Sequence, residues 1–133
     1  MNIATNAYLF FAGITLTVVG AYIGLTPSEY LSQLNFQTNI SAAAMSEMRG
    51  MGGTLLVCGL FSFMTIFKKQ MASSALIICL LVFSSFSIFR CLGIVVDGLP
   101  NQGILIALSL EAVFAFLGWT LWFKRRFREV TRH

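Results

Sequence analysis

Five ionisable residues stand inside or at the edge of segments that are otherwise apolar, namely Glu47, Arg49, Arg90, Asp97 and Glu111. Glu111 is the most isolated, because residues 103–123 contain no other charge. A single charge at the centre of a membrane helix costs about 2.5–3.5 kcal/mol on insertion scales. Ionisable groups in such places pair with one another, hold the polar part of a ligand, or move protons. We therefore take these five residues as the candidate site or ion-pair cluster, with Glu111 as the candidate acid/base group.

Helical spacing brings two of these residues to the same depth. At 1.5 Å per residue, Arg90 lies about 10 Å below Asp97, and Glu111 lies about 12 Å below Gly103. If the helices that carry them are antiparallel neighbours, Arg90 can reach Glu111. Arg90 and Asp97 are seven residues apart and share a helix face.

Glu47 and Arg49 point to different sides of their helix, about 200° apart. Arg49 shares its stripe with Gly53, Leu56 and Leu60. We predict that this stripe, and Arg49 with it, faces the interior of the bundle.

The elements that must position this cluster are membrane-spanning helices. Hydrophobic residues make up 57% of the 133-residue chain and charged residues 11%. A bilayer core needs roughly 20 apolar helical residues, and the runs are continuous, unlike the alternating strands of a barrel. The sequence predicts an all-α, four-transmembrane-helix bundle, a single domain over residues 1–133, with spans at about 5–25, 43–67, 71–96 and 101–124. The first span lacks the basic start of a signal peptide, so we expect it to be retained.

The orientation of the bundle follows from its basic residues. Of the nine Lys and Arg residues, seven lie after the second span or after the fourth, namely Lys68, Lys69, Lys124, Arg125, Arg126, Arg128 and Arg132. The two opposite loops, residues 26–41 and 97–102, contain none. Because cytoplasmic loops are enriched in Lys and Arg, we predict that both termini are cytoplasmic. The protein is then a multi-pass protein of the cell inner (cytoplasmic) membrane, and its charged cluster lies near the outer leaflet.

The two outer loops carry recognisable local signals. Thr26, Pro27 and Glu29 form a helix-start pattern of cap, first-turn proline and capping-box acid. A short outer-side helix is therefore expected after the first span, either lying on the membrane or covering the bundle. Residues 97–100, Asp-Gly-Leu-Pro, form a turn that makes the third and fourth spans antiparallel neighbours.

Small residues indicate where the helices approach one another. Gly20 and Gly24 form a small-xxx-small pair, which favours packing within the chain over a possible homo-oligomer seam. In the fourth span, small residues and the acid recur at helical spacing, so this face should point inward: Gly103, Ala107, Glu111, Ala115 and Gly118.

The order of these motifs resembles that of a known family. The residues that carry the resemblance are Glu47-Met48-Arg49-Gly50 with Gly52-Gly53, Arg90, Asp97-Gly98-x-Pro100 and Glu111. They are similar to the pattern of the domain of unknown function 4345 family, small four-helix bacterial integral membrane proteins. The resemblance covers essentially the whole chain. It implies the same architecture and site, without naming an activity or a ligand.

The chain lacks the residue patterns of metal sites, cofactor sites and common catalytic motifs. The single histidine is the terminal His133, and the cysteines Cys58, Cys79 and Cys91 have no CxxC spacing. We therefore expect no metal site and no cofactor, and the cysteines should pack in the core. Nucleotide-binding and hydrolase fingerprints are missing. The basic tail fits anionic headgroups, so we expect membrane lipids as partners and no nucleic acid.

Three classes of function remain open at this stage. The favoured one is a bundle that binds a small or lipophilic molecule through Arg49, Arg90 and Glu111. The second is a membrane-embedded acid/base enzyme resembling sterol-isomerase-like four-helix proteins, with Glu111 as the acid/base. The third is a structural or accessory subunit whose ion-pair network only fixes the helices.

Overall fold

The computed structural model describes residues 3–35 and 41–130, with side chains described up to Phe127. These residues form five α-helices and one 3-10 turn: α1 (Ile3–Leu25), α2 (Pro27–Gln33), α3 (Ala42–Phe67), η1 (Lys69–Met71), α4 (Ala72–Asp97) and α5 (Gln102–Val130). Four of the helices are long and apolar enough to cross a membrane. The predicted spans agree with them within a few residues, except that α5 continues through the basic segment after residue 124. Arg132 lies outside the described residues.

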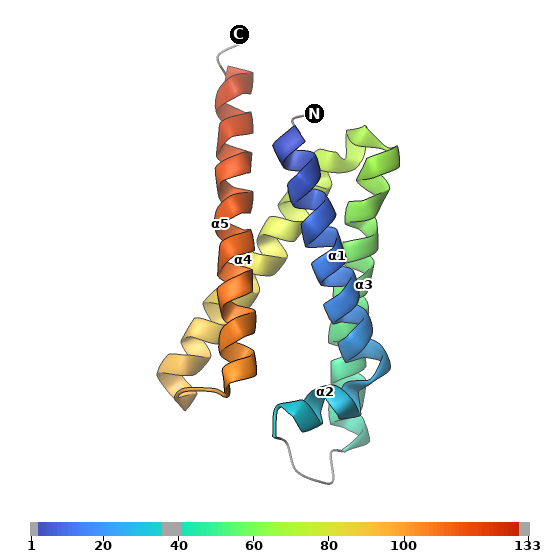
Figure 1. Ribbon diagram of the computed structural model, residues 1–133, viewed down its shortest axis with the longest axis vertical. Coiled ribbons are helices and arrows are strands. Elements are labelled where there is room, and N and C mark those ends of the chain that lie inside the picture. Colours follow the sequence, from blue (N-terminus) through green and yellow to red (C-terminus); the bar gives the residue numbers. More distant parts are fainter. Residues whose placement is uncertain (1–2, 36–40, 131–133) are drawn as a thin grey trace.

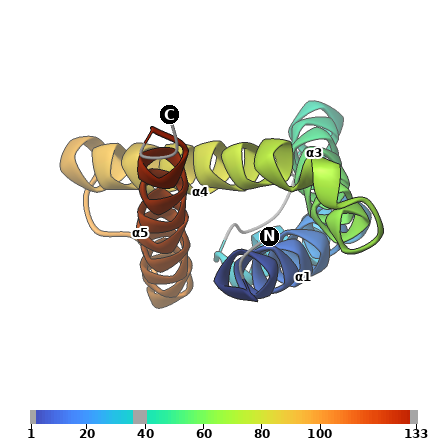
Figure 2. The same cartoon turned by 90° about the horizontal axis from the view of Figure 1, so that it is seen from above.

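Two helix pairs make up the bundle (Figure 1). α1 packs along α3, and α4 packs antiparallel to α5. The α4–α5 connection turns at Gly98, whose φ of 97° lies in the left-handed region that glycine adopts without strain. α4 starts beside α3 and then slants across the bundle, so the two pairs separate toward the end where α2 lies (Figures 1 and 2). The start of α1 and the end of α5 lie at the same end of the molecule.

Glycines allow the backbones of α1 and α3 to come into direct contact. We call this contact the glycine seam and define it as Gly13, Gly20 and Gly24 of α1 with Gly52 and Gly59 of α3. A Cβ added to Gly20 would lie 2.7 Å from the Gly52 carbonyl oxygen, and one added to Gly59 would lie 2.8 Å from that of Gly13. Close backbone approach is how membrane helices gain packing energy. Gly20 and Gly24 thus pack within the chain, and a homo-oligomer through them stays a prediction.

The face of α3 that is buried differs from the predicted one. Its buried residues are Gly52, Leu55, Gly59, Ser62 and Thr65. Gly53 has open space around it, and Leu60 is 50% exposed. The prediction that the Gly53, Leu56 and Leu60 stripe faces inward was therefore wrong. Gly52 and Gly59, rather than the Arg49 stripe, mark the line along which α1 can come closest.

The hydrophobic core fills the end of the bundle where α1 begins. Leu9, Ala12 and Leu16 of α1 pack there with the first half of α4. The Tyr8 hydroxyl donates a hydrogen bond to the Phe114 carbonyl oxygen at 3.1 Å, which ties α1 to α5. Of the cysteines, Cys79 lies in this core and Cys58 packs against it, whereas Cys91 is exposed on the outside of α4, contrary to the prediction of core packing.

α2 folds against the opposite end of the bundle. Pro27 and Leu31 are buried, and the Tyr30 ring meets the Tyr22 ring edge-on at 6.1 Å. The short helix is therefore present as predicted, and it covers the bundle. The capping pattern is not used, because the Thr26 hydroxyl donates to the Tyr22 carbonyl oxygen, at the end of α1, and caps no N–H of α2.

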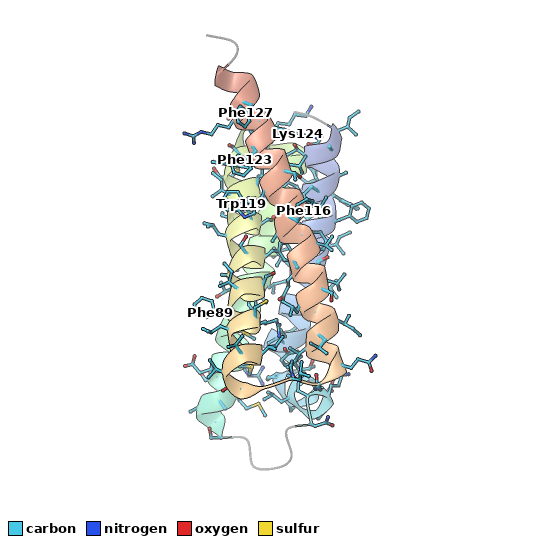
Figure 3. The ribbon with its side chains drawn as sticks, turned by 90° about the vertical axis from the view of Figure 1, so that its left-hand side faces the viewer. Phe89, Phe116, Trp119, Phe123, Lys124 and Phe127 are labelled. Atoms are coloured by element: carbon cyan, nitrogen blue, oxygen red, sulfur yellow. The ribbon has the colours of Figure 1, made fainter. Side chains whose placement is uncertain are left out.

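The outward faces of α4 and α5 are strongly apolar (Figure 3). Phe89, Phe116 and Phe127 are each about 70% exposed, and Trp119 and Phe123 lie on the same side. Such a surface is unfavourable in water and suits a lipid environment. Together with the four long apolar helices, it indicates a multi-pass membrane protein.

Candidate functional site

Arg90 and Glu111 form an ion pair between α4 and α5. The Arg90 Nε donates to both carboxylate oxygens of Glu111, at 2.9 and 3.1 Å. Both side chains are largely shielded, with exposed fractions of 20% for Arg90 and 15% for Glu111. The guanidinium carbon also lies 5.7 Å from the centre of the Phe86 ring. The meeting of these two helices at Arg90 and Glu111, expected from helical depth, is therefore present.

Small residues on α5 place Glu111 on its inner face. Ala115 and Gly118, one and two turns further on, are buried, and Ala107, one turn before, is half-buried. Gly118 lies against the Tyr8 ring, where a Cβ would come 2.7 Å from the Tyr8 hydroxyl oxygen. The predicted inward stripe is thus correct for these positions. Gly103, at the start of α5, is exposed instead.

A cavity of about 290 Å³ lies beside the ion pair. Its walls come from α1, α2, α3, α4 and α5, and apart from Arg90 and Glu111 they are apolar or aromatic with a few hydroxyls. The lining residues are Thr15, Leu16, Val18, Val19, Tyr22, Ile23, Tyr30, Leu55, Val82, Phe83, Phe86, Arg90, Ala107, Leu110 and Glu111. Ligand sites are commonly of this kind, mostly apolar with a few placed polar groups.

The cavity is closed at one end and accessible from the side. Leu16 and Phe83, which belong to the core, form its floor, and Tyr30 of α2 lies at the opposite end. On the side between α1 and α5, the rim residues Val18 and Leu110 are more than half exposed. If the helices cross a membrane, this side faces lipid.

Arg90 keeps hydrogen-bond donors that no described residue uses. A guanidinium has five N–H groups, and only the one on Nε is taken by Glu111. No described residue accepts a hydrogen bond from either Nη group. Arg90 is also the single cation among the described residues that line the cavity.

Arg49 lies elsewhere. Its Nη1 donates to the carbonyl oxygens of Gly24, at 3.0 Å, and Leu25, at 3.4 Å. The last carbonyls of a helix have no partner within it and carry partial negative charge, so Arg49 stabilises the end of α1. It does not line the cavity.

The five-residue charged cluster is therefore not assembled. Glu47 and Asp97 are exposed, and within residues 3–35 and 41–130 no ion pair joins either of them, or Arg49, to Arg90 or Glu111. The physical reason is the slant of α4, whose far end, with Asp97, moves away from the start of α3, where Glu47 and Arg49 lie. The prediction of one common cluster was wrong in this respect.

Sequence reasoning missed the aromatic wall of the cavity. Phe83 and Phe86 precede Arg90 by seven and four residues, so they share its helix face, and this spacing could have identified them. Tyr22 and Tyr30 also line the cavity. Their role depends on the fold of α2 back over the bundle, which the sequence does not specify.

Metal binding has no support in the described residues. No group of three or more His, Cys, Asp or Glu residues among them is placed to hold a metal ion. Aliphatic and aromatic side chains make up most of the cavity lining, and Arg90 and Glu111 are its charged residues.

The fold and the site together define a helical protein with four candidate membrane spans and an apolar cavity whose wall contains one ion pair. The chain belongs to the domain of unknown function 4345 family, whose model matches residues 4–122. The family resemblance noted from the motifs is thereby confirmed. Neither a search of curated proteins nor a search of solved structures gives a match.

Proposed function

We propose that the protein lies in a bacterial inner membrane and binds a lipophilic molecule in its cavity. Arg90 and Glu111 hold the polar part of that molecule. Both termini are cytoplasmic in this proposal, because most of the Lys and Arg residues lie directly after α3 or from residue 124 onward, in the last part of α5 and beyond it. The end with α2 and the cavity then lies toward the outer leaflet.

One observation carries the proposal, namely an apolar cavity of about 290 Å³ with an ion pair in its wall. A purely structural pair is stable enough when neighbouring helices enclose it, and it needs no space beside it. Here the unused Nη donors of Arg90 belong to a residue that lines the cavity. A ligand acceptor placed there satisfies donors that otherwise have no protein partner.

The route of entry follows from the side of the cavity that is accessible. Val18 of α1 and Leu110 of α5 flank it with exposed apolar side chains. A molecule dissolved in the bilayer can reach the cavity between these helices without passing through water. Membrane lipids and lipophilic small molecules are therefore the partners we propose.

A second candidate function is structural. Arg90 and Glu111 join α4 to α5 by two hydrogen bonds from one Nε, and a charged pair of this kind fixes the register of two membrane helices. A third candidate function is acid/base catalysis by Glu111, and it is supported by the position of the Glu111 carboxylate in the cavity wall. The structural reading is separated from ligand binding by filling the cavity without replacing Arg90 or Glu111.

The experiment replaces Ala107 by phenylalanine. Ala107 lines the cavity, whereas Ala112, on the same helix, is exposed on its outer face. We expect wild type and Ala107→Phe to fold equally, but mass spectrometry of organic extracts should find an enriched lipophilic molecule only with wild type. Ala112→Phe is the matched control and should keep the molecule.

The comparison can also overturn the proposal. If the extracts of wild type, Ala107→Phe and Ala112→Phe contain the same lipids as protein-free membranes, the cavity holds no selected ligand. The structural reading of Arg90 and Glu111 would then be preferred.

A further inference from the structure

We infer that the cavity selects a ligand whose polar group is a neutral carbonyl on a ring, such as a cyclic ketone or a quinone, and that it rejects carboxylates of the same shape. This inference rests on the proposed function and adds to it the chemical class of the ligand. It follows from three features of the cavity wall: the donors that are unused, the charge balance and the aromatic surfaces.

The unused donors define what kind of group can bind. The Nη groups of Arg90 supply N–H donors only, because arginine has no acceptor. A carbonyl oxygen is the complementary group, and a hydrogen bond from a charged donor is stronger than one between neutral groups. The two carboxylate oxygens of Glu111 both accept from Nε, so the carboxylate is already engaged with the same guanidinium.

The charge balance decides between a neutral acceptor and an anion. The formal charges of Arg90 and Glu111 sum to zero, and no other Lys, Arg or His is among the described residues lining the cavity. A ligand carboxylate would bring a second negative charge close to Glu111 and leave one charge without a counter-ion. An unpaired charge in an apolar site is strongly unfavourable, so a neutral carbonyl is preferred.

The aromatic walls and the volume define the shape of the bound group. Phe86 lies under the guanidinium, and Tyr22 and Tyr30 lie on the side of α1 and α2. Flat rings pack well against such side chains. An apolar cavity of about 150 Å³ takes a benzene molecule, so about 290 Å³ accommodates a head of two fused rings. A longer tail can leave between α1 and α5.

The test uses three probes that share one two-ring skeleton: 1-tetralone, tetralin and tetralin-1-carboxylate. Binding is measured to the full chain in phosphatidylcholine nanodiscs by equilibrium dialysis, with protein-free nanodiscs subtracted. We expect wild type to bind the ketone roughly ten- to a hundredfold more tightly than the hydrocarbon, the range of one charge-assisted hydrogen bond. The carboxylate should bind more weakly than the ketone.

A charge substitution provides the sharpest arm of the test. Glu111→Gln leaves Arg90 as an unpaired cation beside the cavity, so affinity for tetralin-1-carboxylate should rise at least about tenfold. Unchanged binding of tetralin by this variant reports that the cavity is intact. Arg90→Gln combined with Glu111→Gln removes both charges and should abolish the gain.

The outcomes separate this inference from the proposed function. Equal binding of ketone and hydrocarbon by wild type would refute carbonyl selection while leaving a lipophilic cavity. Tightest binding of the carboxylate by wild type would refute it as well and indicate an anion site. If none of the three probes binds, both the proposed function and the inference fail.

Discussion

The glycine seam gives a prediction in which two neighbouring residues should respond in opposite directions. Gly52 packs against the backbone of α1, whereas Gly53, the next residue, has open space where a side chain would lie. Replacing either glycine by alanine adds the same single methyl group to α3. Only the position relative to α1 differs.

The expected magnitudes follow from the distances. A Cβ at position 52 would lie 2.6 Å from the Gly24 Cα and 2.7 Å from the Gly20 carbonyl oxygen, whereas ordinary contact begins at 3.4 Å. Backbone atoms cannot rotate away, so α1 and α3 must separate, and overpacking of this kind costs about 1–3 kcal/mol. At position 53 nothing is displaced, and alanine in a helix is better than glycine by about 0.5–1 kcal/mol.

Thermal unfolding in detergent measures both effects. At roughly 4 °C per kcal/mol for a chain of this size, Gly52→Ala should lower Tm by roughly 4–12 °C, and Gly53→Ala should raise it by roughly 2–4 °C. Fluorescence-detected size-exclusion chromatography after heating measures the Tm of each variant on small samples. Should Gly52→Ala prove as stable as Gly53→Ala, α1 and α3 are not in backbone contact at this point, and the packing described above is incorrect.

Two further substitutions test the contacts across α4 and α5 and between α1 and α5. Arg90→Met and Glu111→Met should each lower Tm and folding yield, because each leaves a charge unpaired in an apolar site, at a cost of about 2.5–3.5 kcal/mol. The double variant should recover most of the loss, and additive losses would contradict pairing. Tyr8→Phe removes the hydrogen bond to Phe114 and should lower the unfolding free energy by about 1 kcal/mol. A change below about 0.3 kcal/mol, which is within the usual scatter of such differences, would show that this bond contributes nothing.

The number of helices and most of their limits were predictable because they depend on local properties, although α5 continues past the predicted end at residue 124. Apolar runs of membrane length and the Gly98–Pro100 turn determine α4 and α5 almost completely. The pairing of Arg90 with Glu111 was predictable for the same reason, since two antiparallel neighbours joined by a short turn have a calculable depth. The inward face of Ala107, Glu111 and Ala115 follows from their periodicity.

The parts that could not be predicted depend on how the two helix pairs sit relative to each other. The slant of α4 separates Asp97 from Arg49, and no local pattern encodes it. Arg49 was predicted to face the interior, and it binds the end of α1 instead because α3 comes close to Gly24 and Leu25. The cavity exists for this same reason, as a space between helices that diverge.

The central claim is that the cavity holds a selected lipophilic molecule, and a photo-crosslinker at two positions of α4 tests it most directly. Phe86 lines the cavity, and Phe89, one turn away, is 69% exposed on the outer surface. Each is replaced in turn by p-benzoylphenylalanine, the cells are irradiated, and intact masses of the purified protein are measured. We predict one discrete adduct at position 86 and a mixture of bulk phospholipids at position 89. The same phospholipid mixture at both positions, or no adduct at position 86, would contradict the claim.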